Sequence, residues 1–551
     1  MLPENLLAGQ MMHRPLRVGD ILEYAAEIHP DGEIVTAAVE GGLHRATYPA
    51  LRTRVARLAH GLRAMGIGAG DRVATLAWNT QRHFELYYAI AGIGAVCHTI
   101  NPRLSADQFT YIVNHAGDRA IFFDSTFTPL LEALWGRMPD GLIPVELCAP
   151  GHVTAHTIPD VRAYEDLFEH SDSFDWPDFS EEAACALCYT SGTTGDPKGV
   201  LYSHRAMVLH SLFLMASAQS TYRAGNRILP VVPLFHANAW GIPYAAPLAG
   251  CSIVMPGPRL DGASLWELMN GEEVGTAYGV PTVWLGLLDE MDRRGAVPKG
   301  LREVVIGGSA APRPMIERFM ADYGVDVIHG WGMTEMSPVG TLSALTARME
   351  KWPLQERIDL KARQGRRMFG VDLKIVDDAG SRLPHDGLAT GELFVRGNAV
   401  VSGYFENAAA SISAFDAEGW FATGDVAAIS EDGFLMIADR TKDLIKSGGE
   451  WISSLDVESI AMGHPGVANC AVIAIPHPKW DERPLLVVQK ALGTDPEVDE
   501  LRAHVGKHLA SWQVPDDVVF VDELPLTATG KVSKLELRLR FKDHAIERTP
   551  G

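Results

Sequence analysis

The sequence is poor in cysteine. Only six cysteines occur in 551 residues, scattered between Cys97 and Cys470. A disulfide framework needs densely paired cysteines, so we expect reduced thiols and a reducing compartment. Cys185 and Cys188 form a single Cys-x-x-Cys pair in an apolar run, and no second pair follows. This pattern favours buried structural thiols over a metal or redox site.

Positive charge and long apolar runs are also scarce. The 48 Lys and Arg residues face 69 Asp and Glu, a net charge of −21, which disfavours nucleic acid or an anionic bilayer as partner. Residues 1–5 lack the basic-then-apolar start of a signal peptide, and the C-terminal residues are not a peroxisomal address. Prolines and polar residues interrupt the most apolar tract, 228–258, so it is expected to be buried or to line a cleft. We therefore expect a cytoplasmic protein without a transmembrane segment, while peripheral membrane contact stays open.

The chain is long enough, and at 47% hydrophobic residues apolar enough, for two or more domains. In its first part, apolar periodicity predicts helices over residues 48–65 and 105–115 and strands over 72–78, 96–100 and 119–123. This alternation predicts an α/β fold with helix-covered parallel sheets. Beyond residue 366, short alternating strands predict a compact β-rich subdomain. We divide the chain into a large N-terminal domain, 1–440, and a small mobile α+β lid, 441–551.

The stretch Tyr189-Thr-Ser-Gly-Thr-Thr-Gly-Asp-Pro-Lys-Gly-Val200 combines four hydroxyls, three glycines and a lysine. Glycines allow successive N–H groups to turn toward an anion, and the hydroxyls and Lys198 add further donors, so the stretch is expected to hold phosphate. It is not a Walker A loop, because Pro197 occupies the second glycine position of that motif. Apolar residues before it and a possible helix start at Ser203 predict a strand–loop–helix setting.

Further motifs follow in a fixed order. They are Val232-Pro-Leu-Phe-His-Ala-Asn-Ala-Trp-Gly241, Gly330-Trp-Gly-Met-Thr-Glu335, Thr423-Gly-Asp425, Asp439-Arg-Thr-Lys-Asp-Leu-Ile-Lys-Ser-Gly-Gly-Glu-Trp451 and Pro525-Leu-Thr-Ala-Thr-Gly-Lys531. Together with the phosphate loop, they resemble the adenylate-forming superfamily: acyl-CoA synthetases, peptide-synthetase adenylation domains and luciferases. The resemblance spans nearly the whole chain and is closest to medium- and long-chain fatty acyl-CoA synthetases and to methylthioalkanoate–CoA ligases.

The resemblance implies an ATP site. Its expected residues are Thr190, Ser191, Gly192, Thr193, Thr194, Lys198, Gly308, Ser309, Ala310, Trp331, Gly332, Met333, Thr334, Asp425 and Arg440. Glu335 is expected to bind Mg²⁺, and Asp425 to accept the ribose hydroxyls, a task that suits an acceptor-only carboxylate. Trp331 stands where the family usually has tyrosine, and either ring can stack on adenine. Taken alone, Thr334-Glu335 also fits a helix N-cap, and Thr-Gly-Asp also fits a turn.

The resemblance also implies the groups that act on the acid and on CoA. The expected catalytic residues are Lys531, His236, Thr334 and Glu335. His236, Trp240 and Gly241 would form the acyl pocket and its gate, Lys442 the hinge, and Gly448 and Gly449 the CoA tunnel. From pattern alone, a histidine or tryptophan in an apolar tract is more often a core residue.

The implied activity is that of an ATP- and Mg²⁺-dependent acid–thiol ligase that converts a medium- to long-chain fatty acid to acyl-CoA through acyl-AMP. Expected partners are the acid, ATP, CoA and a second copy in a homodimer. The alternatives are a short methylthioalkanoate or aryl acid as substrate, a luciferase-like oxygenase, and a carrier-loading adenylation enzyme. The last is disfavoured because His236-Ala237 stands where that family places an aspartate. A non-catalytic binding protein is disfavoured by Lys531, Glu335 and Asp425 occurring together.

Overall fold

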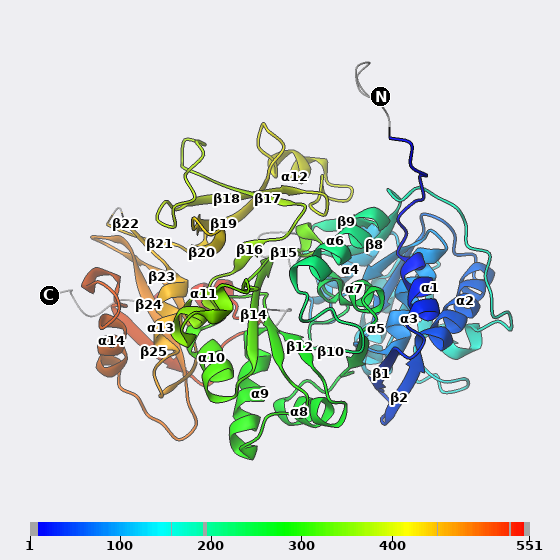
Figure 1. Ribbon diagram of the computed structural model, residues 1–551, viewed down its shortest axis with the longest axis horizontal. Coiled ribbons are helices and arrows are strands. Elements are labelled where there is room, and N and C mark those ends of the chain that lie inside the picture. The colour runs from blue at the N-terminus through cyan, green and yellow to red at the C-terminus, as the bar shows by residue number, and fades with distance from the viewer. Residues whose placement is uncertain (1–8, 156, 191–195, 449, 528–530, 545–551) are drawn as a thin grey trace.

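The computed structural model describes residues 9–155, 157–190, 196–448, 450–527 and 531–544. Within these residues the chain forms three β-sheets with helices packed against them (Figure 1). The expected α/β class is confirmed, and so is the small C-terminal unit that follows a large N-terminal part.

The first sheet has seven strands in the order β7-β6-β5-β3-β4-β8-β9, parallel except for the antiparallel pair β8 and β9. The strands are β3 (Arg72–Leu76), β4 (Val96–Thr99), β5 (Ala120–Phe123), β6 (Ile143–Glu146), β7 (Arg162–Ala163), β8 (Ala184–Tyr189) and β9 (Gly199–Ser203). The helices along this part of the chain are α2 (Tyr48–Ala64), α3 (Gln81–Gly92), α4 (Ala106–Ala116), α5 (Thr128–Leu134) and α6 (His204–Ser217). α4 begins in a capping box between Ser105 and Gln108, which satisfies free N–H groups of its first turn. Thr47 takes the N-cap position of α2, but its side chain makes no capping hydrogen bond.

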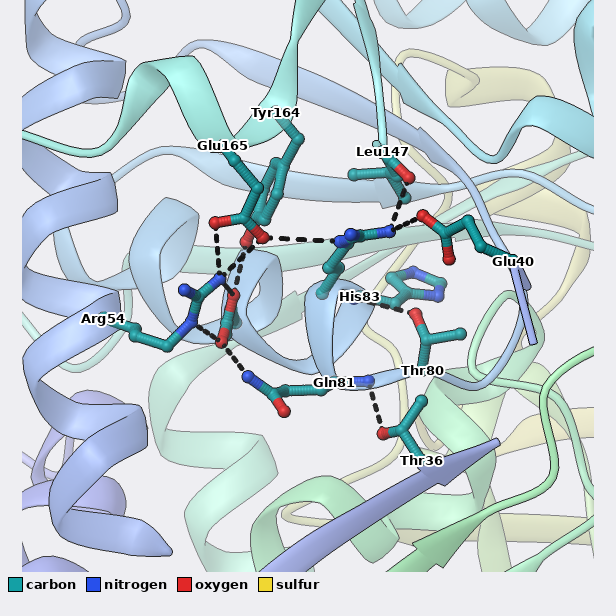
Figure 2. A network of polar contacts seen from close by, with 11 residues as sticks. Thr36, Glu40, Arg54, Thr80, Gln81, His83, Leu147, Tyr164 and Glu165 are labelled. Atoms are coloured by element: carbon teal, nitrogen blue, oxygen red, sulfur yellow. Dashed lines mark hydrogen bonds and ion pairs between the residues drawn. The ribbon is translucent and has the colours of Figure 1, made fainter. Parts of the chain in front are cut away.

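A polar network fixes α2 against α3 beside this sheet. Arg54 of α2 donates to Glu85 of α3 at 2.6 Å and to Glu165 at 3.0 Å, and Tyr164 donates to Glu85 at 2.7 Å. Figure 2 shows the side chains of Arg54, Tyr164 and Glu165 close to one another in this network. Because the Glu85 side chain is fully buried, loss of Arg54 would leave a buried carboxylate without its charged partner.

The second sheet has thirteen strands among the described residues, in the order β17-β18-β19-β20-β16-β15-β14-β13-β12-β10-β11-β1-β2. They are β1 (Glu33–Ala37), β2 (Leu43–Thr47), β10 (Arg227–Pro230), β11 (Ser252–Met255), β12 (Thr276–Gly279), β13 (Glu303–Ile306), β14 (Asp326–Gly332), β15 (Val339–Leu342), β16 (Gly365–Arg367), β17 (Val371–Val376), β18 (Gly391–Gly397), β19 (Phe421–Ile429) and β20 (Phe434–Arg440). The helices of these segments are α1 (Gly19–Ile28), α7 (Ile242–Leu248), α8 (Gly262–Gly271), α9 (Pro281–Arg294), α10 (Arg313–Glu317), α11 (Leu354–Ala362) and α12 (Ala408–Ser413).

The strands from β10 to β14 are parallel, and those from β15 to β20 pair antiparallel. The sequence predicts a compact β-rich subdomain beyond residue 366, and β16 to β20 form such an antiparallel region. Because β16 pairs with β15, this region continues the second sheet.

The C-terminal unit, residues 445–540, has its own sheet and core. Its strands are β21 (Ile445–Ser447), β22 (Glu450–Ile452), β23 (Val467–His477), β24 (Asp481–Lys490) and β25 (Asp517–Val521), and its helices are α13 (Ser454–Ala461), α14 (Val498–Gly506) and α15 (Lys534–Arg540). This unit lies at the opposite side of the molecule from α1 and α2 (Figure 1).

Composition raised two questions about the structure: the state of the cysteines and the presence of membrane-spanning helices. All six cysteines are free and buried, and Cys185 and Cys188 lie in β8, where burial raises the pKa of both thiols. The interpretation of this pair as structural thiols is therefore confirmed. Among the described residues, no helix is both long enough and apolar enough to cross a membrane.

Candidate active site

A cavity of about 500 Å³ opens where several parallel strands of the second sheet end. Residues after the carboxyl ends of β10, β12 and β13, and the end of β14 itself, form its floor, as is usual for ligand sites in open α/β sheets. Tyr404, residues 421–424, residues 440–442 and Lys531 also line the cavity. The expected site residues that line it are Thr190, Lys198, His236, Trp240, Gly308, Trp331, Gly332, Met333, Thr334, Glu335, Arg440, Lys442 and Lys531.

The phosphate loop reaches the cavity through the parts that the structure describes. Thr190 and Lys198 close its base, since Thr190 N–H donates to the Lys198 carbonyl at 2.9 Å and Lys198 N–H to Thr190 Oγ1 at 3.2 Å. The expected strand before the loop and helix start at Ser203 are confirmed, because β8 precedes the loop and Ser203 caps α6. The loop does not lead directly into the helix, however, since the short strand β9 lies between them and pairs antiparallel with β8. Ser191, Gly192, Thr193 and Thr194 lie outside the described residues.

Glu335 is a buried carboxylate at the wall of the cavity. Tyr404 Oη donates to Glu335 Oε1 at 2.8 Å, and the Lys198 ammonium lies 4.9 Å from the Tyr404 ring centre. Burial raises the pKa of Glu335, an effect that Tyr404, Arg440 and Lys198 oppose. The Glu335 carboxylate is a hard oxygen ligand that would be stabilised by a nearby positive charge. It therefore suits Mg²⁺, which binds proteins through one or two carboxylates together with substrate phosphates. The neighbouring Thr334 is held by its carbonyl, which accepts from Tyr202 Oη at 2.6 Å.

Asp425, Arg440 and Trp331 form a second polar group. Strands β19 and β20 pair Asp425 with Arg440, so that Arg440 Nε lies 2.7 Å from Asp425 Oδ1. The Trp331 indole N–H donates to Asp425 Oδ2 at 2.9 Å. Asp425 is buried, which raises its pKa, while Arg440 opposes that rise. Each carboxylate oxygen has a second lone pair, so Asp425 can still accept from a hydroxyl.

The loop after β13 contributes Gly307 and Gly308 to the cavity, whereas Ser309 and Ala310 are not among its lining residues. A Cβ atom added at Gly308 would lie 3.6 Å from Lys531 Cε and 3.8 Å from Trp240 Cζ2. Both distances are ordinary van der Waals contacts, so Lys531 and Trp240 pack over this loop, while glycine is favoured by the φ of 82° and by Val280 Cγ1 at 3.1 Å from the added Cβ.

Lys531 and His236 meet at this part of the cavity. Burial, with Arg440 nearby, lowers the pKa of Lys531 to about 8. Burial, with the charge of Lys531, lowers the pKa of His236 to about 4. At neutral pH the site therefore combines a charged lysine with a neutral imidazole, which can offer one N–H donor and one acceptor.

Trp240 stands in an unusual backbone segment. Ala237, Asn238, Ala239 and Trp240 have φ between 45° and 58°, and Gly241 has φ of 83°, so five consecutive residues are left-handed. Such a conformation costs about 1–2 kcal/mol for each non-glycine residue. Tyr87 Oη, which donates to the Leu234 carbonyl and to Asn238 Oδ1, helps to hold it. Strain of this kind collects at functional sites.

Trp240 packs against a group of apolar side chains that also line the cavity. The Trp240 ring lies edge-on to Tyr278, with ring centroids 6.3 Å apart. We call this part of the lining the apolar arm, and it consists of Leu214, Ala218, Tyr278, Val305, Ile328, Val339 and Leu342. Gly241 does not line the cavity: a Cβ there would lie 2.9 Å from His210 Nδ1, so glycine allows α6 to pack closely.

The expected hinge and CoA residues are divided between two places. Lys442 lines the cavity, whereas Gly448 lies outside it, beside Trp480 and with φ of 63°. Gly449 lies outside the described residues. The C-terminal unit therefore presents Lys531, and not Gly448, to the cavity in this arrangement.

Sequence reasoning missed two tyrosines of the site, Tyr404 and Tyr278. Tyr404 reaches Glu335 from 69 residues further along the chain, and a single tyrosine in a loop gives no local signal of such a contact. Tyr278 lies in the short, fully buried strand β12, so the sequence pattern around it predicts only burial.

Two family models match the chain. The model for the AMP-binding enzyme covers residues 22–405, and the model for the AMP-binding enzyme C-terminal domain covers residues 456–531. The chain belongs to the AMP-binding enzyme family. The adenylate-forming resemblance drawn from the motifs is thereby confirmed.

Individual relatives match this AMP-binding enzyme over nearly its whole length. It is 48% identical to the 3-methylmercaptopropionyl-CoA ligase of Ruegeria lacuscaerulensis, over 98% of this chain and 99% of that one. It is 46% identical to the medium-chain-fatty-acid–CoA ligase of Ectopseudomonas oleovorans, over 98% of each chain. Its fold matches the crystal structure of an anthranilate CoA ligase in complex with anthranoyl-AMP, with a TM-score of 0.85 and 24% identity over 96% of this chain and 98% of that one.

Proposed function

We propose that this AMP-binding enzyme is an ATP-dependent carboxylate–CoA ligase, an acid–thiol ligase. In the first half-reaction, a carboxylate oxygen attacks the α-phosphorus of ATP, which gives acyl-AMP and releases pyrophosphate. In the second, the CoA thiol attacks the acyl carbon and AMP leaves. The observation that carries the proposal is that Lys531, Glu335 and Arg440, which pairs with the buried Asp425, line the same cavity as the apolar arm.

The chain's own residues suit the first half-reaction. Two anions must approach each other, so positive charge and an in-line arrangement are needed. Lys531 would neutralise the carboxylate and the α-phosphate, with neutral His236 beside the carboxylate. Thr190 and Lys198 would hold the outer phosphates, Thr334 the α-phosphate, and Asp425 with Arg440 the ribose. Mg²⁺, held by Glu335, would supply further charge neutralisation at the phosphates.

The apolar arm supports a fatty acid as the acid substrate. Each methylene buried there contributes about 0.8 kcal/mol, so a hydrocarbon chain gains affinity with every carbon that fits. We therefore propose a medium- to long-chain fatty acid. The alternative is a short methylthioalkanoate, because a relative of 48% identity is named as a ligase for such an acid. A luciferase-like oxygenase shares the first half-reaction and differs by its oxygen uptake.

For the second half-reaction we propose that the C-terminal unit is a lid. The lid would extend over residues 441–551, after an N-terminal domain of residues 1–440. It would rotate about Lys442, withdraw Lys531, and bring Gly448 and Gly449 to the cavity as part of a tunnel for CoA. Glycine suits such a tunnel because a thin arm can pass close to its backbone.

Pyrophosphate release, measured with fatty acids of graded length, 3-methylmercaptopropionate and benzoate, tests the substrate. We expect the highest kcat/KM for a medium- or long-chain acid and a rise with each added carbon up to the optimum. An optimum at 3-methylmercaptopropionate would support the alternative, and oxygen consumption during turnover would indicate an oxygenase.

We further propose that the enzyme works in the cytoplasm as a homodimer. The six free cysteines support a reducing compartment. Sedimentation of the purified protein tests the dimer, which predicts twice the chain mass of 59.9 kDa.

A further inference from the structure

Helix α15 begins three residues after Lys531 and carries two basic side chains that face the hinge region. Lys534 Nζ lies 2.8 Å from Glu458 Oε1 and donates to Ser454 Oγ at 2.5 Å. One helical turn later, Arg538 donates to the Asp443 carboxylate and, at 3.4 Å, to the Lys442 carbonyl. A spacing of four residues puts both side chains on one face of the helix.

Lys534 is joined through Ser454 to the end of the large sheet. Ser454 donates both its N–H, at 2.7 Å, and its hydroxyl, at 2.6 Å, to Asp439 Oδ2. Asp439 is the next-to-last residue of β20, before the expected hinge, whereas Ser454 begins α13 of the C-terminal unit. The ammonium of Lys534 therefore polarises a hydroxyl that bonds across the hinge, and such a charge-assisted bond is stronger than a neutral one.

The contacts continue from Asp439 into the nucleotide site. Asp439 Oδ1 accepts the N–H of Arg440 at 2.8 Å, and Arg440 is the residue that pairs with Asp425 in the cavity wall. A connected path thus leads from α15, through Ser454 and Asp439, to the residues proposed to hold ribose.

We propose that Lys534 is a positioning residue for acyl-AMP formation, acting through Ser454 and Asp439 as a latch that holds Lys531 in the cavity. The latch consists of Lys534, Ser454 and Asp439. It rests on the proposed two-step ligase function. When the lid rotates about Lys442, Asp439 stays with the large sheet while Ser454 and Lys534 leave it, so the latch stabilises only the arrangement that forms acyl-AMP.

Lys534 also has a partner inside the C-terminal unit, because it pairs with Glu458, a half-buried carboxylate that also accepts the Val472 N–H. Its removal would leave Glu458 without a charged partner and could unfold the unit. Ser454→Ala avoids this, because it removes only the bridging hydroxyl and keeps the Lys534–Glu458 pair. The two variants together separate the latch from the stability of the unit.

The test measures both half-reactions for each variant: acyl-AMP and pyrophosphate formation without CoA, and acyl-CoA formation from supplied acyl-AMP. Lys534→Met should slow the first by about tenfold relative to the second, and Ser454→Ala should shift the ratio in the same direction by a smaller factor. Lys534→Arg, which keeps the charge, should recover most of the first half-reaction. Lys490→Met serves as the control, because Lys490 pairs with Asp495 within the same unit and away from the hinge.

Equal loss in both half-reactions, or a ratio no different from that of Lys490→Met, would overturn the latch. If Lys534→Met does not fold, Ser454→Ala decides: a changed ratio supports the latch and an unchanged ratio rejects it. Wild-type enzyme that forms no acyl-AMP would instead contradict the proposed function, and the latch with it.

Discussion

Lys531 lies in surroundings that favour its neutral form, although the proposed chemistry needs its charge. Burial and Arg440 lower its pKa to about 8, so the charged fraction falls as the pH rises through that value. We expect kcat/KM for acyl-AMP formation to decline about tenfold per pH unit above pH ~8, because this parameter reports groups of the free enzyme. Acyl-CoA formation from supplied acyl-AMP should lack that inflection. In the Lys531→Arg variant the side chain stays charged, so the first half-reaction should lose this inflection. If the variant still shows the inflection, it belongs to a group other than Lys531.

Trp240 lines the cavity close to Gly308, which Lys531 also approaches, and its ring packs against Tyr278 of the apolar arm. We propose that it gates the arm rather than closes its far end. Trp240→Ala should then leave the preferred chain length unchanged and alter the dependence of acid KM on ATP. Ala218→Val, which narrows the arm itself, should shorten the preferred acid and provides the contrast. A longer optimum for Trp240→Ala would make the indole a pocket floor.

At the scale of elements, the left-handed turn at residues 237–241 depends on a glycine that has two separate roles. Gly241 needs a positive φ, and any side chain there would meet His210. Gly66 offers a matched control, because its φ of 81° is similar but nothing lies within 4 Å of an added Cβ. In both Ala variants, backbone strain should lower the free energy of unfolding by about 1–2 kcal/mol. Urea denaturation should place Gly241→Ala at a clearly lower midpoint than Gly66→Ala, and equal midpoints would show that the contact with His210 is unimportant.

The hinge gives a second prediction at this scale. Proline fixes φ near −65° and removes an N–H, so Lys442→Pro should restrict rotation of the C-terminal unit. Since Lys531 already lines the cavity, acyl-AMP formation should largely persist while acyl-CoA formation from acyl-AMP falls by an order of magnitude or more. Burst measurements of pyrophosphate and of acyl-CoA separate the two. Undiminished overall turnover would contradict a hinge at this residue.

At the scale of the whole molecule, the sequence was informative where signals are local. Apolar periodicity predicted α2 and parallel strands of the first sheet, and the family resemblance predicted thirteen of the residues that line the cavity. It failed where distant segments decide the outcome. The short strand β9 is recognised only through its pairing with β8, and β16 joins the large sheet through β15. Four left-handed residues other than glycine oppose local preference, and they persist because of contacts such as that of Tyr87 with Asn238.

In the proposed function, the acid is activated when its carboxylate attacks the α-phosphorus of ATP directly. Transfer of ¹⁸O from a labelled fatty acid tests it most directly. If acyl-AMP forms, its bridging oxygen comes from the acid, and cleavage by CoA leaves that oxygen on AMP. We expect mass spectrometry to find one ¹⁸O atom in each AMP produced with acyl-CoA. Unlabelled AMP, or label in inorganic phosphate formed together with ADP, would contradict the account.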